Sequence, residues 1–212
     1  MQLEAKDVCF RYTAKTPAIL RNVSFSVSEG EKVGVVAPSG YGKTTFVKIL
    51  AGYERPTKGQ VLLDGTPLAV KGALPVQLIC QHPENAINPR WKMQRVLKEG
   101  GQLRPEVLAA MGIEPEWLSR YPRELSGGEL QRFCVARALC AETRFLIADE
   151  MSTMLDVITQ AQIWNTLLAE ADKRGMGVVV VTHNPALAQR VCTRVVDLRD
   201  INHIEIAQDA IA

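Results

Sequence analysis

The chain has 212 residues, of which 47% are hydrophobic and 23% are charged, a composition that suits one globular domain with a buried core. Its 25 basic and 23 acidic residues leave a net charge of +2 and are mixed along the chain. They form no basic tail or stripe of the kind that marks a nucleic-acid-binding protein, so we expect no nucleic-acid partner.

No segment is typical of a membrane span or a secretory leader. The longest purely aliphatic run, residues 178–181, is far too short to cross a bilayer, and residues 1–4 do not begin like a signal peptide. The cysteines form an odd set without C-x-x-C spacing, which favours reduced thiols in the core over a metal or redox site. They are Cys9, Cys80, Cys134, Cys140 and Cys192. We expect a cytoplasmic protein that reaches any membrane through partners.

The first thirty residues predict strands, because Val23, Phe25 and Val27 alternate with serines in the period of a half-buried strand. Short apolar runs farther along the chain predict further strands, and the run at residues 32–37 is of the kind buried in a parallel sheet. They fall at residues 32–37, 61–63, 76–80, 145–148 and 178–181.

Helical patterns alternate with these runs. They cover residues 45–51, with Gly52 as the cap, and residues 130–139, and a further helix ends near residues 174–175. Between Pro83 and Pro122, prolines and three short helical stretches indicate an inserted helical subdomain. Strands that alternate with helices predict an α/β fold with a parallel sheet.

A loop of small residues separates the run at 32–37 from the helix that follows. It reads Ala37, Pro38, Ser39, Gly40, Tyr41, Gly42, Lys43 and Thr44, and Thr45 at the start of the helix is a further candidate for nucleotide binding. In such a loop, backbone N–H groups converge on phosphate oxygens, and the helix N-terminus adds positive potential. Lys43 would then reach the β- and γ-phosphates of ATP, and the Thr44 hydroxyl would bind Mg²⁺.

The alternative is a glycine-rich turn that contains Gly-Lys-Thr by chance, but the strand–loop–helix setting favours nucleotide binding. Ala37 stands where such a loop usually opens with glycine. Because alanine tolerates positive φ poorly, we expect a slightly altered loop.

Two acidic residues follow directly on the apolar run at 145–148. Because ligands of α/β proteins lie at the carboxyl ends of the strands, Asp149 and Glu150 would face the phosphate loop. Asp149 would hold Mg²⁺, and Glu150 would polarise the attacking water as general base. Taken alone, residues 145–150 could also be a strand that runs into an ordinary acidic loop. The phosphate loop upstream favours a P-loop NTPase instead.

Residues 125–132 read Leu-Ser-Gly-Gly-Glu-Leu-Gln-Arg and place a hydroxyl and glycine N–H groups at the start of a predicted helix. Such a turn can serve as a second anion site. A bare Ser-Gly-Gly would be an ordinary helix cap, but the whole segment resembles the signature motif of ATP-binding-cassette proteins. The resemblance implies a γ-phosphate held by Ser126, Gly127, Gly128 and Glu129 across a dimer, with two ATP molecules between two cassettes.

The resemblance covers nearly the whole chain and implies further roles. It implies that Tyr12 stacks on adenine, that Gln81 senses Mg²⁺ and the γ-phosphate, and that His183 contacts the γ-phosphate. Asp156 would belong to a loop across the dimer interface, residues 153–156. The Mg²⁺ ligands it implies are Thr44, Gln81 and Asp149, and the catalytic residues are Lys43, Glu150 and His183.

The fold that the resemblance implies is a RecA-like P-loop NTPase core with a parallel sheet, an N-terminal antiparallel β subdomain and an inserted helical subdomain. Residues 1–212 would be a single nucleotide-binding domain. Within it, residues 1–81 and 136–212 would form the β subdomain and core, and residues 82–135 the helical subdomain with the signature motif.

Residues 81–90, 120–125 and 155–157 are similar to the dipeptide, oligopeptide and nickel importer branch of that family. This implies the ATPase subunit of an importer for peptides or nickel, with ATP and Mg²⁺ as cofactors. Its partners would be a second cassette, identical or a sister chain, transmembrane permease subunits and a solute-binding protein, at the inner face of the membrane. The alternative is a soluble cassette that acts as a scaffold or regulatory ATPase without a transporter, like the accessory proteins of carbon–phosphorus lyase.

Overall fold

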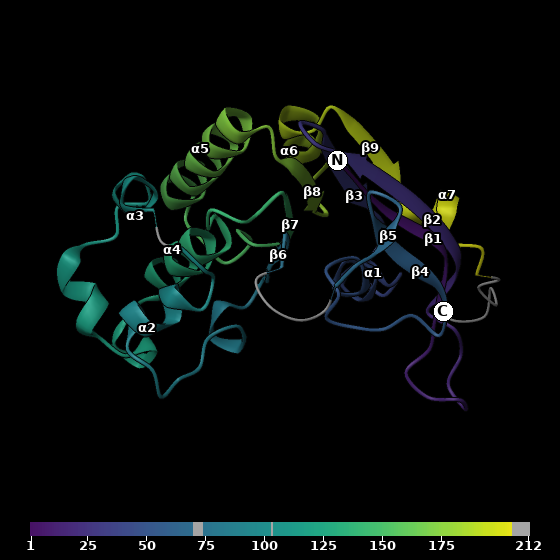
Figure 1. Cartoon of the computed structure of the whole chain (residues 1–212), viewed down its shortest axis with the longest axis horizontal. Coiled ribbons are helices and arrows are strands. Elements are labelled where there is room, and N and C mark those ends of the chain that lie inside the picture. Colours follow the sequence, from purple (N-terminus) through teal and green to yellow (C-terminus); the bar gives the residue numbers. More distant parts are fainter. Residues whose placement is uncertain (70–73, 103, 205–212) are drawn as a thin grey trace.

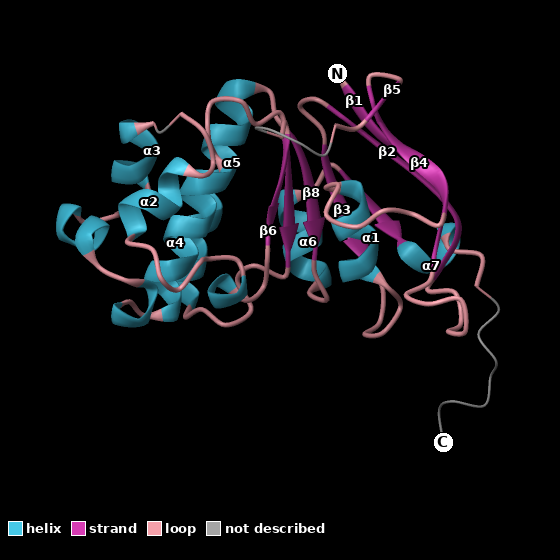
Figure 2. Cartoon of the chain, turned by 60° about the horizontal axis from the view of Figure 1, so that its bottom comes forward, coloured by secondary structure: helices cyan, strands magenta, loops and turns pink. Residues whose placement is uncertain are grey.

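The computed structural model describes residues 1–69, 74–102 and 104–204 and shows two β-sheets beside a group of helices (Figure 1). In Figure 2 the parallel sheet stands in the middle, with the antiparallel sheet on one side and the helical group on the other. This arrangement confirms the expected α/β fold with an antiparallel β part and a helical part. No helix among the described residues is both long and apolar enough to cross a membrane.

The N-terminal strands form the antiparallel sheet, in the order β2-β1-β4-β5. Val23, Phe25 and Val27 of β2 are buried while their neighbours face outward, so the period of two in the sequence marks the core face correctly. The strands are β1 (Gln2–Phe10), β2 (Leu20–Ser28), β4 (Lys58–Leu63) and β5 (Thr66–Pro67).

The parallel sheet has the order β6-β7-β8-β3-β9. Its strands are β3 (Lys32–Val36), β6 (Val76–Ile79), β7 (Phe145–Asp149), β8 (Gly177–Val181) and β9 (Arg194–Asp197). Every residue of β7 and β8 is buried, as expected for strands covered on both faces. Because neighbouring strands run parallel, the loops after β3, β6, β7 and β8 leave from one edge of the sheet.

Helices connect these strands and cover the sheet. The longer ones are α1 (Lys43–Leu50), α4 (Gly127–Ala138), α5 (Val157–Arg174) and α6 (Pro185–Val191), followed by the short α7 (Leu198–Ile201). α1 follows β3, α5 connects β7 to β8, and α6 connects β8 to β9. α1 and α4 begin two and three residues earlier than the apolar pattern predicts, because each helix starts directly after its N-cap residue, Gly42 or Ser126, and its first residues are not apolar.

Between β6 and α4 the chain forms short helical pieces. They are η1 (Pro83–Asn85), α2 (Met93–Lys98), α3 (Pro105–Ala110), η2 (Pro115–Ser119) and η3 (Pro122–Glu124). All except α2 begin with proline, whose fixed φ and missing N–H suit the first helical position. The expected subdomain boundary at residue 135 falls inside α4, and the division of the chain into subdomains stays a proposal.

Two apolar clusters pack on opposite faces of the parallel sheet. Leu146 and Val178 belong to the cluster on the side of α4 and α5, while Phe145, Ile147 and Val179 belong to the cluster shared with α1 and the antiparallel sheet. Alternate residues of each buried strand therefore hold two layers together.

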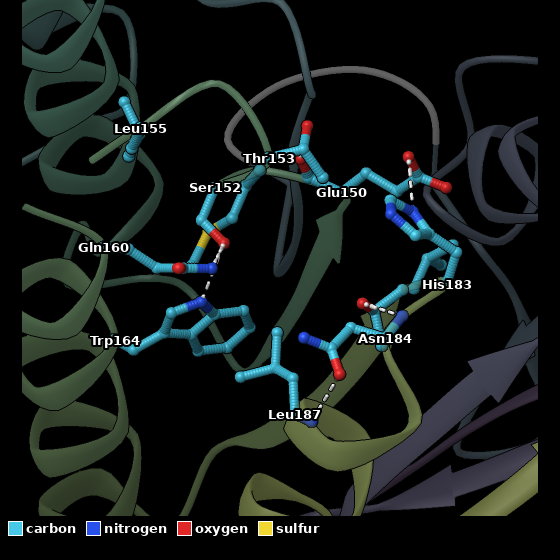
Figure 3. A pocket seen from close by; sticks show the side chains of 12 residues that line it. Glu150, Ser152, Thr153, Leu155, Gln160, Trp164, His183, Asn184 and Leu187 are labelled. Atoms are coloured by element: carbon cyan, nitrogen blue, oxygen red, sulfur yellow. Dashed lines mark hydrogen bonds and ion pairs between the residues drawn. The ribbon is translucent and has the colours of Figure 1, made fainter. Parts of the chain in front are cut away.

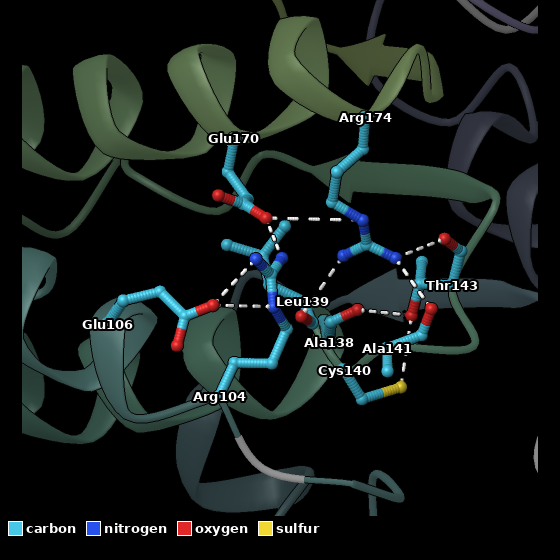
Figure 4. Close-up of polar contacts among 9 residues, drawn as sticks. All are labelled: Arg104, Glu106, Ala138, Leu139, Cys140, Ala141, Thr143, Glu170 and Arg174. Atoms are coloured by element: carbon cyan, nitrogen blue, oxygen red, sulfur yellow. Dashed lines mark hydrogen bonds and ion pairs between the residues drawn. The ribbon is translucent and has the colours of Figure 1, made fainter.

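A buried ion cluster joins the helical group to the core (Figure 4). Glu170 of α5 is 9% exposed and forms ion pairs with Arg104, at the start of α3, and with Arg174. The Nη2 atom of Arg174 also donates to the carbonyl oxygens of Ala141, at 2.9 Å, and Thr143, at 2.7 Å. Glu170 thus ties α3 to α5, and Arg174 ties α5 to the loop before β7.

The cysteines are less buried than the sequence predicts. Cys134 and Cys140 lie in the core, as expected, but Cys9, Cys80 and Cys192 are only half-buried. The odd number and irregular spacing of the cysteines indicate unpaired thiols. They do not predict how deeply each thiol is buried, because burial depends on where its strand or helix packs.

Candidate nucleotide-binding site

The phosphate loop connects β3 to α1 and uses glycine where the backbone needs positive φ. Gly40 has φ +82° and Gly42, the N-cap of α1, has φ +88°. A Cβ atom on Gly42 would lie 2.8 Å from Cγ2 of Ile19, so a side chain there would clash as well as strain the backbone. These two positions therefore require glycine.

Ala37 does not take the positive φ that alanine tolerates poorly. Positive φ among the described non-glycine residues occurs at Asp7, Asn22, Asp64 and Glu150, and Ala37 is not one of them. Its side chain is 8% exposed and packs in the cluster between α1 and the antiparallel sheet. Alanine is acceptable here because the first position of the loop keeps ordinary backbone geometry.

A cavity of about 450 Å³ opens over this loop. Its lining comes from the phosphate loop, from the start of α1, and from the ends of β6 and β7. The lining residues are Ile19, Ser39, Gly40, Gly42, Lys43, Thr44, Thr45, Gln81 and Glu150. Most of the residues expected to bind nucleotide are thus brought to one cavity by segments far apart in sequence.

Lys43 is the central cation of this cavity. Its side chain is 6% exposed, and its Nζ atom donates to the carbonyl oxygens of Ala37, at 2.8 Å, and Pro38, at 3.2 Å. The same nitrogen lies 4.0 Å from Oε1 of Glu150. An ammonium group held at the mouth of a helix N-terminus can neutralise phosphate oxygens.

Asp149 ends β7 and is 5% exposed. Its Oδ1 atom has no hydrogen-bond partner among the described residues. Burial raises the pKa of the Asp149 carboxyl above its usual value, although the nearby Thr44 hydroxyl lowers it. A buried carboxylate oxygen without a donor, next to a hydroxyl, fits the hard oxygen ligands that Mg²⁺ takes, and an ion bound there would offset the cost of burial.

Glu150 is held in a strained turn at the end of β7. Its φ is +47°, a value that costs a non-glycine residue about 1–3 kcal/mol. Its N–H donates to the carbonyl oxygen of Val181 at 3.0 Å, and its carbonyl oxygen accepts a hydrogen bond from the Thr153 hydroxyl at 3.1 Å. The backbone contacts aim the carboxylate of Glu150 at the phosphate cavity.

His183 approaches the same carboxylate from the loop after β8. Its Nδ1 atom lies 3.4 Å from Oε2 of Glu150, and its ring is 63% exposed. Gln81, at the end of β6, donates from Nε2 to the Thr153 hydroxyl at 3.2 Å. Glu150 therefore has a cation or imidazole on each side and can accept a proton from a water molecule placed between it and the phosphates.

A second, smaller cavity of about 170 Å³ lies behind Glu150 and His183 (Figure 3). Among the side chains around it, Ser152, Gln160 and Trp164 are joined by hydrogen bonds. Sequence reasoning missed these residues. The signal is the spacing of Asp156, Gln160 and Trp164, which places them on one face of α5, next to Ser152.

Tyr12 lies apart from the phosphate cavity. Its side chain is 61% exposed, and it lines a neighbouring hollow at the end of β1 together with Phe10, whose ring it meets edge-on at 5.1 Å. The Tyr12 hydroxyl is 3.2 Å from that of Thr45, which connects the two hollows. The position allows a base to stack on the ring while the phosphates reach the loop.

The signature turn does not contribute to the lining of the phosphate cavity on its own chain. Ser126 is the N-cap of α4 and accepts a hydrogen bond from the Glu129 N–H at 3.3 Å, while Glu129 accepts one from the Ser126 N–H at 2.6 Å. A Cβ atom on Gly127 would meet nothing within 4 Å. The capped start of α4 therefore has open space beside its glycine N–H groups.

Asp156 caps α5 by accepting hydrogen bonds from the N–H groups of Ile158, at 3.0 Å, and Thr159, at 2.9 Å. These bonds lower the pKa of its carboxyl. Leu155 and Thr159 lie beside Gly128 of the signature turn. The loop at residues 153–156 thus runs between the end of β7 and the signature turn.

A protein-family model described as ABC transporter matches residues 20–153, which is more than half of the chain and runs from β2 through the phosphate loop and the signature turn to Glu150. The chain belongs to the ABC transporter family. As a member of it, the chain is an ATP-binding cassette that hydrolyses ATP.

This cassette is 33% identical over 211 residues to the nickel import system ATP-binding protein NikE of Staphylococcus aureus, with 93% of this chain and 87% of the relative covered. A solved ATP-binding subunit of an ABC transporter superposes with a TM-score of 0.78 at 25% identity, over 93% of this chain and 85% of that one. The dimeric ATP-binding cassette MJ0796, bound to ADP and Pi after hydrolysis, superposes with a TM-score of 0.77 at 25% identity, over 92% and 93%.

Proposed function

We propose that this cassette powers the import of nickel ions, by binding and hydrolysing ATP as one of a pair of cassettes. The observation that carries the proposal is the match to the nickel import protein of Staphylococcus aureus along 93% of this chain. The segment after Gln81 that resembles the peptide and nickel branch belongs to the same alignment. A scaffold or regulatory role without a transporter has no comparable support.

The roles proposed for the site follow from its charges. Lys43 and the N–H groups around Gly40 and Gly42 would hold the phosphates, because they line one cavity at the N-terminus of α1. Glu150 would accept the proton of the attacking water, since its carboxylate reaches this cavity. His183 would orient that carboxylate and contact the γ-phosphate.

Thr44, Gln81 and Asp149 would hold Mg²⁺. The unpaired, buried Oδ1 of Asp149 supports this, because that oxygen needs a positive partner. The described residues contain no group of three or more acidic, histidine or cysteine side chains that would form a metal site of their own. This donor set suits an ion that arrives with ATP, and the ion would neutralise charge on the phosphate oxygens.

The signature turn would complete the site of a second cassette. The capped start of α4 lies outside the phosphate cavity of its own chain, and the related cassette MJ0796 is dimeric with ADP and Pi. In such a pair, the γ-phosphate would bridge Lys43 of one cassette and Ser126 of the other, so that loss of phosphate after hydrolysis lets the pair open.

The remaining partners follow from the proposed transport. The cassette would bind transmembrane permease subunits at the inner face of the membrane, through Gln81 and the helical group, and work with a solute-binding protein. Movement of these elements between the closed and open pair would couple ATP to the permease.

Nickel uptake in the source organism tests this proposal. We expect that deleting the gene lowers uptake of radioactive nickel and that the wild-type gene restores it. The Lys43→Ala gene should not restore uptake, because the variant lacks the ammonium group that would bind the phosphates. Dipeptide uptake serves as the control. Loss of dipeptide uptake with normal nickel uptake would reject nickel as the solute, and normal uptake of both would reject transport.

A further inference from the structure

We propose that Ser152, Gln160 and Trp164 form a positioning cluster that holds Glu150 in its reactive orientation. The inference rests on the proposed role of Glu150 as the base. None of the three side chains lines the phosphate cavity, and the turn that carries Glu150 is the link we propose between the cluster and the reaction.

The cluster is built on one buried hydroxyl. Ser152 is 4% exposed, and its Oγ atom accepts hydrogen bonds from Nε2 of Gln160 at 2.8 Å and from Nε1 of Trp164 at 3.0 Å. Figure 3 shows both donors converging on this oxygen from the same helix. Trp164 is 5% exposed, so its indole N–H would lose its protein partner if the hydroxyl were removed.

The hydroxyl is connected to Glu150 by a short, bonded turn. Ser152 is two residues after Glu150, and its carbonyl oxygen accepts a hydrogen bond from Leu155 at 3.2 Å. The Thr153 N–H and hydroxyl both donate to the Glu150 carbonyl oxygen, at 3.3 Å and 3.1 Å. A shift of Ser152 would therefore move the backbone that sets the strained φ of Glu150.

Helix α5 supplies a fixed support for this turn. Asp156 caps the helix, and Gln160 and Trp164 follow at intervals of four residues, so the cap and both donors share one face. The other side of the turn is held by the hydrogen bond from Gln81 to Thr153. The turn is thus held by α5 on one side and, on the other, by Gln81, which lines the phosphate cavity.

The small cavity beside the cluster gives the turn room to move. A partly open cavity of about 170 Å³ lies between the Ser152 turn, Trp164 and the residues after β8, and Glu150 and His183 line it too. In a close-packed interior, a buried group keeps its place even when one hydrogen bond is lost, but a group beside a void can relax into it. The two donors therefore fix the turn where packing alone does not.

A buried hydroxyl can also serve folding alone, and the kinetics separate the two roles. A positioning cluster changes the geometry of the reacting groups, so its loss lowers kcat and leaves KM for ATP nearly unchanged. A purely structural cluster lowers the melting temperature but leaves kcat unchanged at a temperature where the variant is folded.

The test measures kcat, KM and melting temperature of the purified full chain for Ser152→Ala, Trp164→Phe and Gln160→Met. We expect kcat to fall about 5–20-fold in Ser152→Ala and about 3–10-fold in Trp164→Phe, with KM within about two-fold of the wild type. Gln160 is only partly buried, so Gln160→Met keeps the test available if the other variants do not fold.

Two controls sharpen the result. Ser152→Thr keeps the hydroxyl and can place its methyl group toward the cavity, so it should restore kcat to within about two-fold of the wild type. Trp117→Phe removes an indole in η2, away from the site, and should leave kcat and KM unchanged. Unchanged kcat in all three cluster variants, or a rise in KM alone, would overturn the proposal.

Failure of this inference is distinct from failure of the assigned roles. If Glu150→Gln turns over ATP normally, the base assignment is wrong and the cluster has nothing to position. If Glu150→Gln is inactive while the cluster variants hydrolyse ATP at the wild-type rate, only the positioning role is rejected.

Discussion

Nδ1 of His183 lies 3.4 Å from Oε2 of Glu150, while Nζ of Lys43 lies 4.0 Å from the other oxygen of that carboxylate. The carboxylate of Glu150 therefore lies between the ammonium group of Lys43, which we propose binds phosphate, and the exposed imidazole of His183. The groups follow three different strands, β3, β7 and β8, and the parallel order of those strands brings them together.

Replacing Glu150 by glutamine should separate ATP binding from hydrolysis. Glutamine keeps the size of the side chain but cannot accept the proton of the attacking water, so we expect turnover to fall at least about 100-fold while ATP still binds. The variant should also accumulate an ATP-dependent dimer, seen by size-exclusion chromatography. Glu116→Gln, at a side chain 69% exposed on the helical group, is the matched control. Normal turnover in Glu150→Gln would remove Glu150 from its role.

The phosphate loop should tolerate glycine at position 37 but reject alanine at position 42. Ala37→Gly should leave ATP affinity within about two-fold and lower the free energy of unfolding by about 0.5–1 kcal/mol, because glycine loses more backbone entropy. Gly42→Ala should weaken ATP binding at least about 10-fold, since the new Cβ atom meets Ile19 at a position with φ +88°. Calorimetric titration with ATP checks both, and equal affinities in the two variants would contradict the loop geometry.

Removing the Asp149 carboxylate should abolish the response to Mg²⁺. We expect Asp149→Asn to bind ATP without Mg²⁺ about as well as the wild type does, but to gain no affinity when Mg²⁺ is added. Chelation of Mg²⁺ should stop hydrolysis in the wild type. Titrating Mg²⁺ against ATP affinity makes the comparison, and an undiminished Mg²⁺ response in Asp149→Asn would assign the ion to other ligands.

Ser126 should matter for turnover but not for ATP binding by one chain. Ser126→Ala leaves the phosphate cavity intact and removes the hydroxyl offered to a second cassette, so we expect turnover to fall at least about 10-fold with ATP affinity unchanged. The loss of the helix cap should cost about 1 kcal/mol of stability. Ser126→Thr preserves both roles and serves as the control. If ATP bound more weakly to the Ser126→Ala variant in dilute, monomeric solution, Ser126 would belong to the ATP site of its own chain instead.

Thiol reactivity should follow burial. Burial raises the pKa of the Cys134 thiol to about 12 and that of Cys192 to about 11, so both are almost entirely protonated at pH 8. Because the thiolate is the reactive form, alkylation of Cys134 should be slow in the folded protein and should accelerate as the pH rises or the chain unfolds. Mass spectrometry of timed alkylation measures this, and rapid labelling of Cys134 at pH 8 would contradict its position in the core.

Local sequence chemistry predicts the parts of this site that depend on one segment. The glycines around Lys43, the acids at the end of β7 and the Ser126 cap of α4 each follow from a short motif whose residues make the structure on their own. The order of the sheet does not follow in the same way. The apolar runs at β6, β7 and β8 indicate that each strand is buried, but they are chemically alike and do not say which strand is whose neighbour.

The turn after Glu150 shows the same limit at a smaller scale. A positive φ usually requires glycine, and nothing in the sequence marks Glu150 as an exception, because the strain is offset by contacts from β8 and from Thr153. The contacts of Ser152 depend on which face of α5 meets the turn. The helical spacing of Gln160 and Trp164 is visible in the sequence. That both side chains bond to Ser152 depends on tertiary packing, which the sequence does not show.

The carboxylate of Glu170 also has a consequence for how the chain melts. A buried acid between two guanidinium groups is costly to leave with one partner missing, so separating α3 from α5 takes Arg104 away from Glu170 and leaves only Arg174, on α5 itself, to compensate its charge. Detachment of α3 while α5 stays folded is therefore costly, so α3 and α5 should unfold together. In a scanning calorimeter the chain should absorb heat in one cooperative peak, and neutralising Glu170 should broaden or split it.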